Sequence, residues 1–161
     1  MGPLLVESFR YNKWANLHLL GVCSDLSPEQ LELSASGTYG SIAKTFQHLL
    51  AAEQRYIRRL TGAEPRINEK EDFPGIAALT KEAEESAERL IELAGSVDPE
   101  DQIEPDRLKP YTKLPAAIVL IQAMHHGNDH RTHICTVLGA NGIEYGDMDV
   151  WAYGIATGVS G

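Results

Sequence analysis

The sequence has few cysteines, a deficit of basic residues and little proline or glycine in its apolar segments. The two cysteines, Cys23 and Cys135, lie far apart and form no Cys-x-x-Cys unit, so a disulfide scaffold is not expected. Lys and Arg number 14 against 23 Asp and Glu, which gives a formal net charge of -9. Because phosphate binding requires a surplus of basic side chains, nucleic acid is not expected as the main partner.

Long apolar runs and targeting signals are also missing. The longest mostly apolar stretch, residues 114–124, covers roughly half of the ~20 residues that cross a bilayer. The first residues lack the basic-then-apolar layout of a signal peptide, and Val6 stands where a myristoylation motif requires Ser or Thr. These absences predict a cytoplasmic protein without a membrane partner.

What the chain does have is helical periodicity, whereas alternating strand patterns are almost absent. Four long helices are predicted, with a short capped segment after the first and a short last helix that Asp149 caps; the ranges are 3–23, 27–30, 41–60, 75–94, 114–138 and 150–156. Residues 96–113 predict a long extended crossover between the third and fourth long helices. The fold class expected is therefore all-α, a four-helix bundle with one domain over residues 1–161.

The first predicted helix carries two asparagines on its apolar stripe. The stripe consists of Leu5, Phe9, Asn12, Asn16, Leu19, Leu20 and Cys23. A buried amide needs hydrogen-bond partners, so Asn12 and Asn16 either line a pocket or bond to a neighbouring helix.

Histidine is concentrated in the fourth long helix, with His125, His126, His130 and His133 in the segment MHHGNDHRTHI. His126 and His130 are about 40° apart on one helix face, so both imidazoles can reach the same metal ion. His133 lies about 10 Å further along the axis than His126, and His125 points about a quarter-turn away. Cys135 faces the opposite side of the helix. The helix therefore offers two metal ligands, and a site requires a third from elsewhere.

Only His18 and His48 remain as candidates for that third ligand. His48 flanks the apolar stripe of the second long helix, from which it can face a neighbouring helix across the core. His18 shares a side of the first helix with Tyr11 and Trp14, which favours a packing or subunit contact. From the residues alone, a shared metal site and a set of ordinary core or surface histidines are equally open.

Four segments together resemble the DinB-like (DinB/YfiT-type) family of metalloenzymes. They are FRYNKWANLHLL at 9–20, TFQHLLAAEQRYIRRL at 45–60, HGNDHRTHI at 126–134 and DVWAYG at 149–154. The resemblance covers nearly the whole chain and is weakest over residues 63–113. One departure is Thr132-His133, where many relatives have Gly-Gln.

The resemblance implies a four-helix bundle, commonly a homodimer, with one divalent metal ion held by three histidines. Carried over position by position, the ligands are His48, His126 and His130. Zinc is the default for three neutral imidazoles with an open position, and nickel, iron or manganese are compatible because ligand type sets metal preference loosely.

Three protein ligands leave a coordination position at which a metal ion can lower the pKa of a water or thiol. Similar proteins use the metal to activate a low-molecular-weight thiol, so a thiol S-transferase acting on a small-molecule substrate is the first expectation. A metal-dependent hydrolase using metal-bound hydroxide requires the same three ligands. A third alternative is a non-catalytic, stress-associated binding module with a structural or vestigial metal site.

Four further residues are candidates for the pocket or for the surroundings of the metal. Asn12 and Asn16 are candidates to line it, and Glu53, on the inner stripe of the second long helix, could support a ligand or act as a base. Arg131 follows a predicted ligand and either anchors an anionic group or pairs with a carboxylate.

Overall fold

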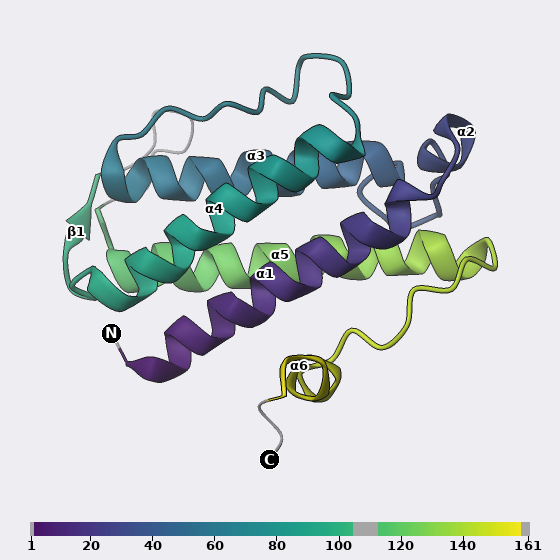
Figure 1. The fold of residues 1–161 in the computed structure, drawn as a ribbon. Coiled ribbons are helices and arrows are strands. Elements are labelled where there is room, and N and C mark those ends of the chain that lie inside the picture. The colour runs from purple at the N-terminus through teal and green to yellow at the C-terminus, as the bar shows by residue number, and fades with distance from the viewer. Residues whose placement is uncertain (1, 105–112, 159–161) are drawn as a thin grey trace.

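The computed structural model describes residues 2–104 and 113–158, and in this part of the chain the fold is helical (Figure 1). The elements are α1 (Pro3–Ser24), α2 (Pro28–Leu31), α3 (Ile42–Thr61), α4 (Ile76–Ser96), β1 (Gln102–Ile103), β2 (Leu114–Pro115), α5 (Ala116–Ala140) and α6 (Val150–Thr157). The four long helices and the short C-terminal helix appear where the periodicity predicts them. The all-α prediction is confirmed. No helix in the described ranges combines the length and apolarity needed to cross a membrane.

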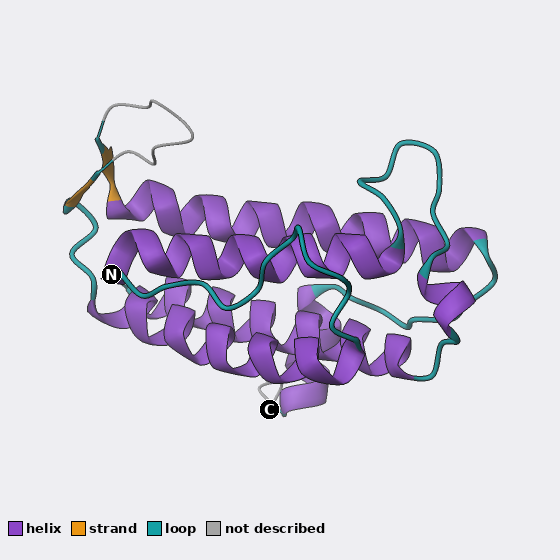
Figure 2. Cartoon of the chain, turned by 90° about the horizontal axis from the view of Figure 1, so that it is seen from above, coloured by secondary structure: helices purple, strands orange, loops and turns teal. Residues whose placement is uncertain are grey.

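The four long helices pack side by side, each of α1 and α3 lying against both α4 and α5. In Figure 1, α1 and α5 run in one direction and α3 and α4 in the other. Residues 62–75 therefore run back along the length of the bundle before α4 begins, as the view in Figure 2 also shows. The antiparallel neighbours α3 and α5 are the two helices that carry the candidate metal ligands.

The connection between α4 and α5 is long, as predicted, but its described ends contain a short antiparallel strand pair that the sequence patterns did not predict. Gln102 pairs with Pro115 and Ile103 with Leu114, so α5 begins at Ala116 rather than at Leu114. Proline fixes its own backbone and disfavours helical geometry in the residue before it, which explains the later start. The predicted extended connection over 96–113 lies partly outside the described residues, at 105–112.

Local signals explain where the helices begin and end. Ser41 and Asp149 accept hydrogen bonds from the backbone N–H groups of Lys44 and Ala152, which satisfies donors at the first turns of α3 and α6. Gly62 ends α3 with a φ of 80°, a left-handed conformation that glycine adopts without strain. Because these caps fix the ends of α3, the position of His48 along the helix axis is fixed as well.

The apolar stripe predicted for the first helix is buried in the structure, except for Leu5, which is half-buried. Phe9, Leu19, Leu20 and Cys23 are almost inaccessible, and the asparagines on the stripe are buried with them. Two apolar clusters fill the bundle: one around Leu20, Phe46 and Ile134, and another around Phe9, Leu90 and Leu120.

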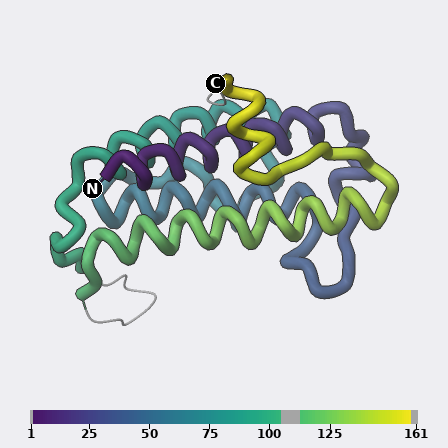
Figure 3. Tube along the Cα trace, turned by 90° about the horizontal axis from the view of Figure 1, so that it is seen from below, coloured from purple at the N-terminus to yellow at the C-terminus, as the bar shows by residue number. Residues whose placement is uncertain are grey.

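The opposite side of α1 is covered by the C-terminal segment of the same chain. The Tyr11 hydroxyl donates to the carbonyl of Met148 at 2.7 Å, and His18 Nε2 lies 2.7 Å from the carbonyl oxygen of Tyr145. The Tyr153 ring on α6 packs against Tyr11 and Trp14, so α6 crosses over α1 (Figure 3). Of the two contacts predicted for His18, the structure shows the packing contact.

Candidate metal centre

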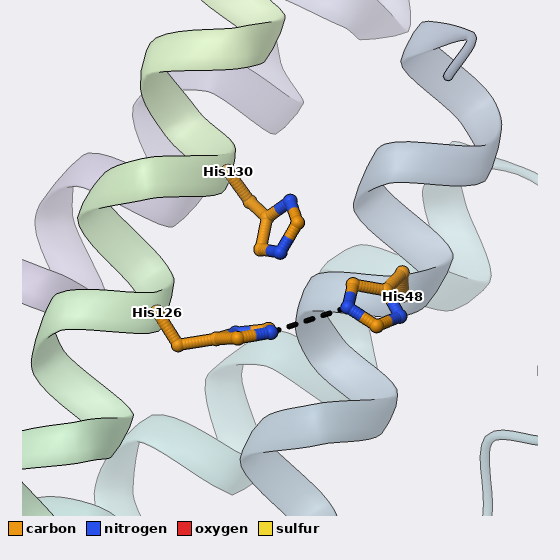
Figure 4. Close-up of side chains that lie close together, drawn as sticks. All are labelled: His48, His126 and His130. Atoms are coloured by element: carbon orange, nitrogen blue, oxygen red, sulfur yellow. Dashed lines mark hydrogen bonds between the residues drawn. The ribbon is translucent and has the colours of Figure 1, made fainter. Parts of the chain in front are cut away.

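Three histidines from two antiparallel helices meet at one point between α3 and α5 (Figure 4). His48 comes from α3, and His126 and His130 come from successive turns of α5. Each offers one ring nitrogen, and these three atoms all lie within 4.8 Å of one another. We call these residues the histidine triad. The structure therefore brings together the three residues that the sequence selects.

One spacing within the histidine triad matches that expected for two ligands of a small divalent cation, and all three ligand atoms lie within 4.8 Å of one another. His48 Nε2 and His126 Nε2 are 3.2 Å apart. Two nitrogens bound to one tetrahedral zinc ion at about 2.0–2.1 Å would lie about 3.3 Å apart. The three imidazoles are thus placed so that they could hold a metal ion.

His48 is oriented by partners outside the helices. Its Nδ1 lies 2.6 Å from Glu69 Oε2 and 3.0 Å from the Tyr39 hydroxyl, and the other oxygen of Glu69 pairs with Arg55. A proton on Nδ1 shared with Glu69 leaves the Nε2 lone pair directed at the other histidines. This carboxylate–histidine arrangement is typical of metal-binding histidines, because it fixes the tautomer and the ring direction.

Tyrosine rings surround the histidine triad. The Tyr39 ring stacks on His48 with centroids 4.2 Å apart and meets His130 edge-on at 5.0 Å, and Tyr56 lies edge-on to His126. The sequence patterns gave no reason to select Tyr39 or Glu69, because both lie in loops whose paths depend on the whole fold.

The environment keeps two of the histidines neutral. Burial lowers the pKa of His126 from 6.5 to about 3, and the neighbouring His130 and His48 add to the shift. Burial likewise lowers the pKa of His130 to about 4, with contributions from His48 and His133. A metal ion binds the neutral imidazole, so these residues do not have to release a proton to act as ligands near neutral pH.

The other candidates in α5 lie outside this group, as their helical positions predict. The His133 ring is 5.4 Å from that of His130 and is not part of the three-residue cluster, and His125 is exposed. Cys135 lines a cavity of about 820 Å³ between α5 and residues 142–150, which the histidine triad does not line. Burial raises the pKa of the Cys135 thiol to about 11, which makes it a poor nucleophile.

The four residues predicted to surround the metal form a separate buried network, here called the polar quartet: Asn12, Asn16, Glu53 and Arg131. Asn12 and Asn16 each donate through Nδ2 to Glu53 Oε1, at 2.8 and 3.0 Å. Arg131 Nη1 donates to the Oδ1 atoms of the same two asparagines, at 2.6 and 2.7 Å. Each asparagine therefore bridges the Glu53 carboxylate, which only accepts hydrogen bonds, and the Arg131 guanidinium, which only donates them.

The structure shows which partners these residues have. Asn12 and Asn16 bond to neighbouring helices, and Arg131, which also lines the cavity beside Cys135, is linked to the carboxylate of Glu53 through their amides. Burial raises the pKa of the Glu53 carboxyl, opposed by Asn12, Arg131 and Asn16. No hydrogen bond among the described residues joins the polar quartet to the histidine triad.

The protein is thus an all-α bundle in which three imidazoles lie between two antiparallel helices. These three imidazoles form a site that could hold one metal ion. The sequence model of the DinB family matches residues 1–157, and the chain belongs to the DinB family. The family indicated by the four sequence segments is therefore confirmed.

A solved structure supports the same fold. The crystal structure of a DinB-like protein from Bacillus cereus ATCC 10987 superposes with a TM-score of 0.69, covering 89% of this chain and 94% of that chain. Sequence identity is 17%, so the similarity establishes the fold and not a shared activity. No curated protein matches the chain.

The lowered pKa values predict how the stability of the metal-free protein depends on pH. In the unfolded chain, His126 and His130 take up protons as the pH falls through about 6.5, whereas in the folded protein they do so only near 3 and 4. Their contribution to the free energy of unfolding is therefore present above pH 6.5 and is lost as the pH falls towards 4.

Urea unfolding at several pH values measures this effect in the parent and in a His126→Gln/His130→Gln variant. The parent should lose more stability than the variant between pH 6.5 and 4, because glutamine does not titrate. Equal losses in the two proteins would contradict the assigned pKa shifts.

The contact between Glu69 and His48 predicts a role for this carboxylate in metal affinity. Glu69→Gln keeps the shape but removes the charge that holds the proton on His48 Nδ1, so affinity for zinc should fall by about 10–100-fold. Competition with a chromophoric chelator measures the change. Glu64→Gln, in the same loop and away from the histidines, should leave the affinity at the parent value; an unchanged affinity in Glu69→Gln would show that the contact does not support the site.

Proposed function

We propose that the chain binds one divalent metal ion through His48, His126 and His130 and uses it to activate a low-molecular-weight thiol for transfer to a small-molecule electrophile. The observation that carries the proposal is the convergence of three ring nitrogens within 4.8 Å from two helices. Zinc is the ion that best suits three imidazoles and one open position, and nickel, iron and manganese are compatible with the same ligands.

A divalent ion at such a site supplies Lewis acidity, which lowers the pKa of a thiol or water placed at the open position. The protein's own residues do the rest. Glu69 holds a proton at His48 Nδ1, so that Nε2 is available as a ligand. Tyr39, which is 40% exposed, stacks on His48 and presents an aromatic edge beside the site, against which an apolar part of a substrate can pack.

The contacts of two carboxylates, Glu69 and Glu53, support a thiol over water as the activated group. Glu69 is engaged by both His48 and Arg55, and Glu53 is buried in the polar quartet. Neither carboxylate is free to act as a general base at the open position. A thiol has a pKa near 8.5, so a small lowering of its pKa is enough for it to ionise near neutral pH, whereas the pKa of water must be lowered far more. The hydrolase alternative relies on the same three ligands and is separated from the transferase by experiment.

Two further expectations belong to this proposal. A cytoplasmic location suits a thiol-dependent reaction, because small thiols are kept reduced there. A homodimer is supported by an exposed apolar side of α6, where Val150, Trp151 and Ile155 are 62–82% exposed. The face of α1 with Tyr11, Trp14 and His18 is covered by its own chain and is a poorer candidate for that contact.

Metal content tests the ligand assignment. Elemental analysis of untagged protein should give about one equivalent of a divalent metal per chain, and His48→Ala and His126→Ala should lose it, because each removes one of three ligands. His125→Ala is the matched control on the same helix and should retain the metal. No metal in the parent after divalent ions are supplied, or full retention in His48→Ala, would contradict the assignment.

Cobalt-loaded protein separates the possible roles of the ion. Addition of 2-mercaptoethanol should produce a sulfur-to-cobalt charge-transfer band, since the thiol takes the open position. The protein should stay folded after metal removal, with a thermal unfolding midpoint lowered by no more than the affinity for the ion accounts for. Absence of the band together with hydrolysis of a test ester would favour the hydrolase. A large fall in the midpoint on metal removal, with no response to thiol, would indicate a structural site in a binding module.

A further inference from the structure

We propose that the polar quartet, together with Gly127, positions the histidine triad. These residues fix the rotation and register of α5 against α1 and α3, and thereby determine how closely His126 and His130 approach His48. None of these residues belongs to the three-histidine group. This proposal rests on the proposed function, because the register of α5 is most important if the three imidazoles bind one metal ion.

The polar quartet and the histidine triad occupy neighbouring stripes of the same two turns of α5. Gly127 follows His126, and Arg131 follows His130, so each pair differs by about 100° around the helix. The stripe of His126 and His130 faces α3, and the stripe of Gly127 and Arg131 faces Asn12 and Asn16 of α1. Since a helix turns as a rigid body, holding one stripe in place fixes the direction of the other.

The hydrogen bonds of the polar quartet can be made in one arrangement of the three helices. Arg131 bonds to two oxygens on successive turns of α1, and the same two side chains bond to a single oxygen of Glu53 on α3. A slip of α5 by one turn, about 5.4 Å, would break both bonds from Arg131. Apolar contacts tolerate such a slip, whereas buried charges with directed bonds do not, which makes them suited to fixing register.

Gly127 contributes to this arrangement because, without a side chain, it allows α1 to approach α5 closely. A Cβ atom at this position would lie 2.8 Å from Asn12 Oδ1 and 3.0 Å from Arg131 Nη1. Gly127 lies inside a helix without a positive φ, so the backbone does not require glycine there. A glycine in a helix interior is disfavoured relative to alanine by about 1 kcal/mol. The close contact with the polar quartet accounts for its presence.

Two variants with small volume changes test the inference. Gly127→Ala adds one methyl group against Asn12 and Arg131, and Glu53→Gln keeps the shape of the side chain but removes the charge opposite Arg131. Leu93→Ala on α4, a helix with no member of either group, is the control for general destabilisation. Circular dichroism first establishes that each protein is folded; if Gly127→Ala does not fold, the isosteric Glu53→Gln decides.

The first readout is metal affinity and geometry. Zinc affinity should fall at least tenfold in Gly127→Ala and Glu53→Gln, and the absorption spectrum of their cobalt forms should change, because the imidazoles no longer converge as in the parent. Leu93→Ala should lower the unfolding midpoint without changing either property. Parent-like affinity and spectra in both folded variants would overturn the inference.

The second readout does not depend on metal. In the metal-free parent, nuclear Overhauser contacts between the rings of His48 and His126 are expected, because their Nε2 atoms are 3.2 Å apart. These contacts should weaken in both variants and persist in Leu93→Ala. If the parent binds no metal, the proposed function fails, and the ring contacts alone decide the inference: their persistence in the folded variants would overturn it.

Discussion

The burial of Arg131 and Glu53 is the constraint on which the rest of the structure depends. Both side chains are at most 4% exposed, and removing an ionised group from water costs several kcal/mol unless its hydrogen bonds are replaced. Asn12 and Asn16 replace them at Glu53 Oε1 and Arg131 Nη1, since an amide can donate to the carboxylate and accept from the guanidinium at the same time, whereas Glu53 Oε2 has no hydrogen-bond partner among the described residues. These directed hydrogen bonds bring α1, α3 and α5 into one defined arrangement.

The histidine triad lies on the side of α5 next to this network, and its chemistry follows from the same burial. Two of the imidazoles are kept neutral by desolvation, which suits them to bind a cation, while Glu69 supplies the third with a defined tautomer. Two adjacent stripes of α5 thus carry different polar groups: Arg131 is hydrogen-bonded within the protein, and His126 and His130 are directed at a position that could hold an ion.

Much of this could be predicted from the sequence, and the reasons for success and failure are physical. Helical periodicity located the long helices, and the i, i+4 spacing of His126 and His130 selected a face, because both depend on local geometry alone. The partners of Arg131 were left open, since they lie more than a hundred residues away along the chain. Glu69 and Tyr39 were missed because loop residues carry no periodic signal, and the course of residues 62–75 along the bundle depends on how the helices pack.

X-ray absorption spectroscopy of the zinc-loaded protein tests the three-histidine site, because it reports the atoms bound to the ion. Three imidazole nitrogens at about 2.0–2.1 Å and one further oxygen or nitrogen neighbour are expected in the absence of added thiol. A first shell with fewer than three imidazoles, or one containing sulfur from Cys23 or Cys135, would contradict it.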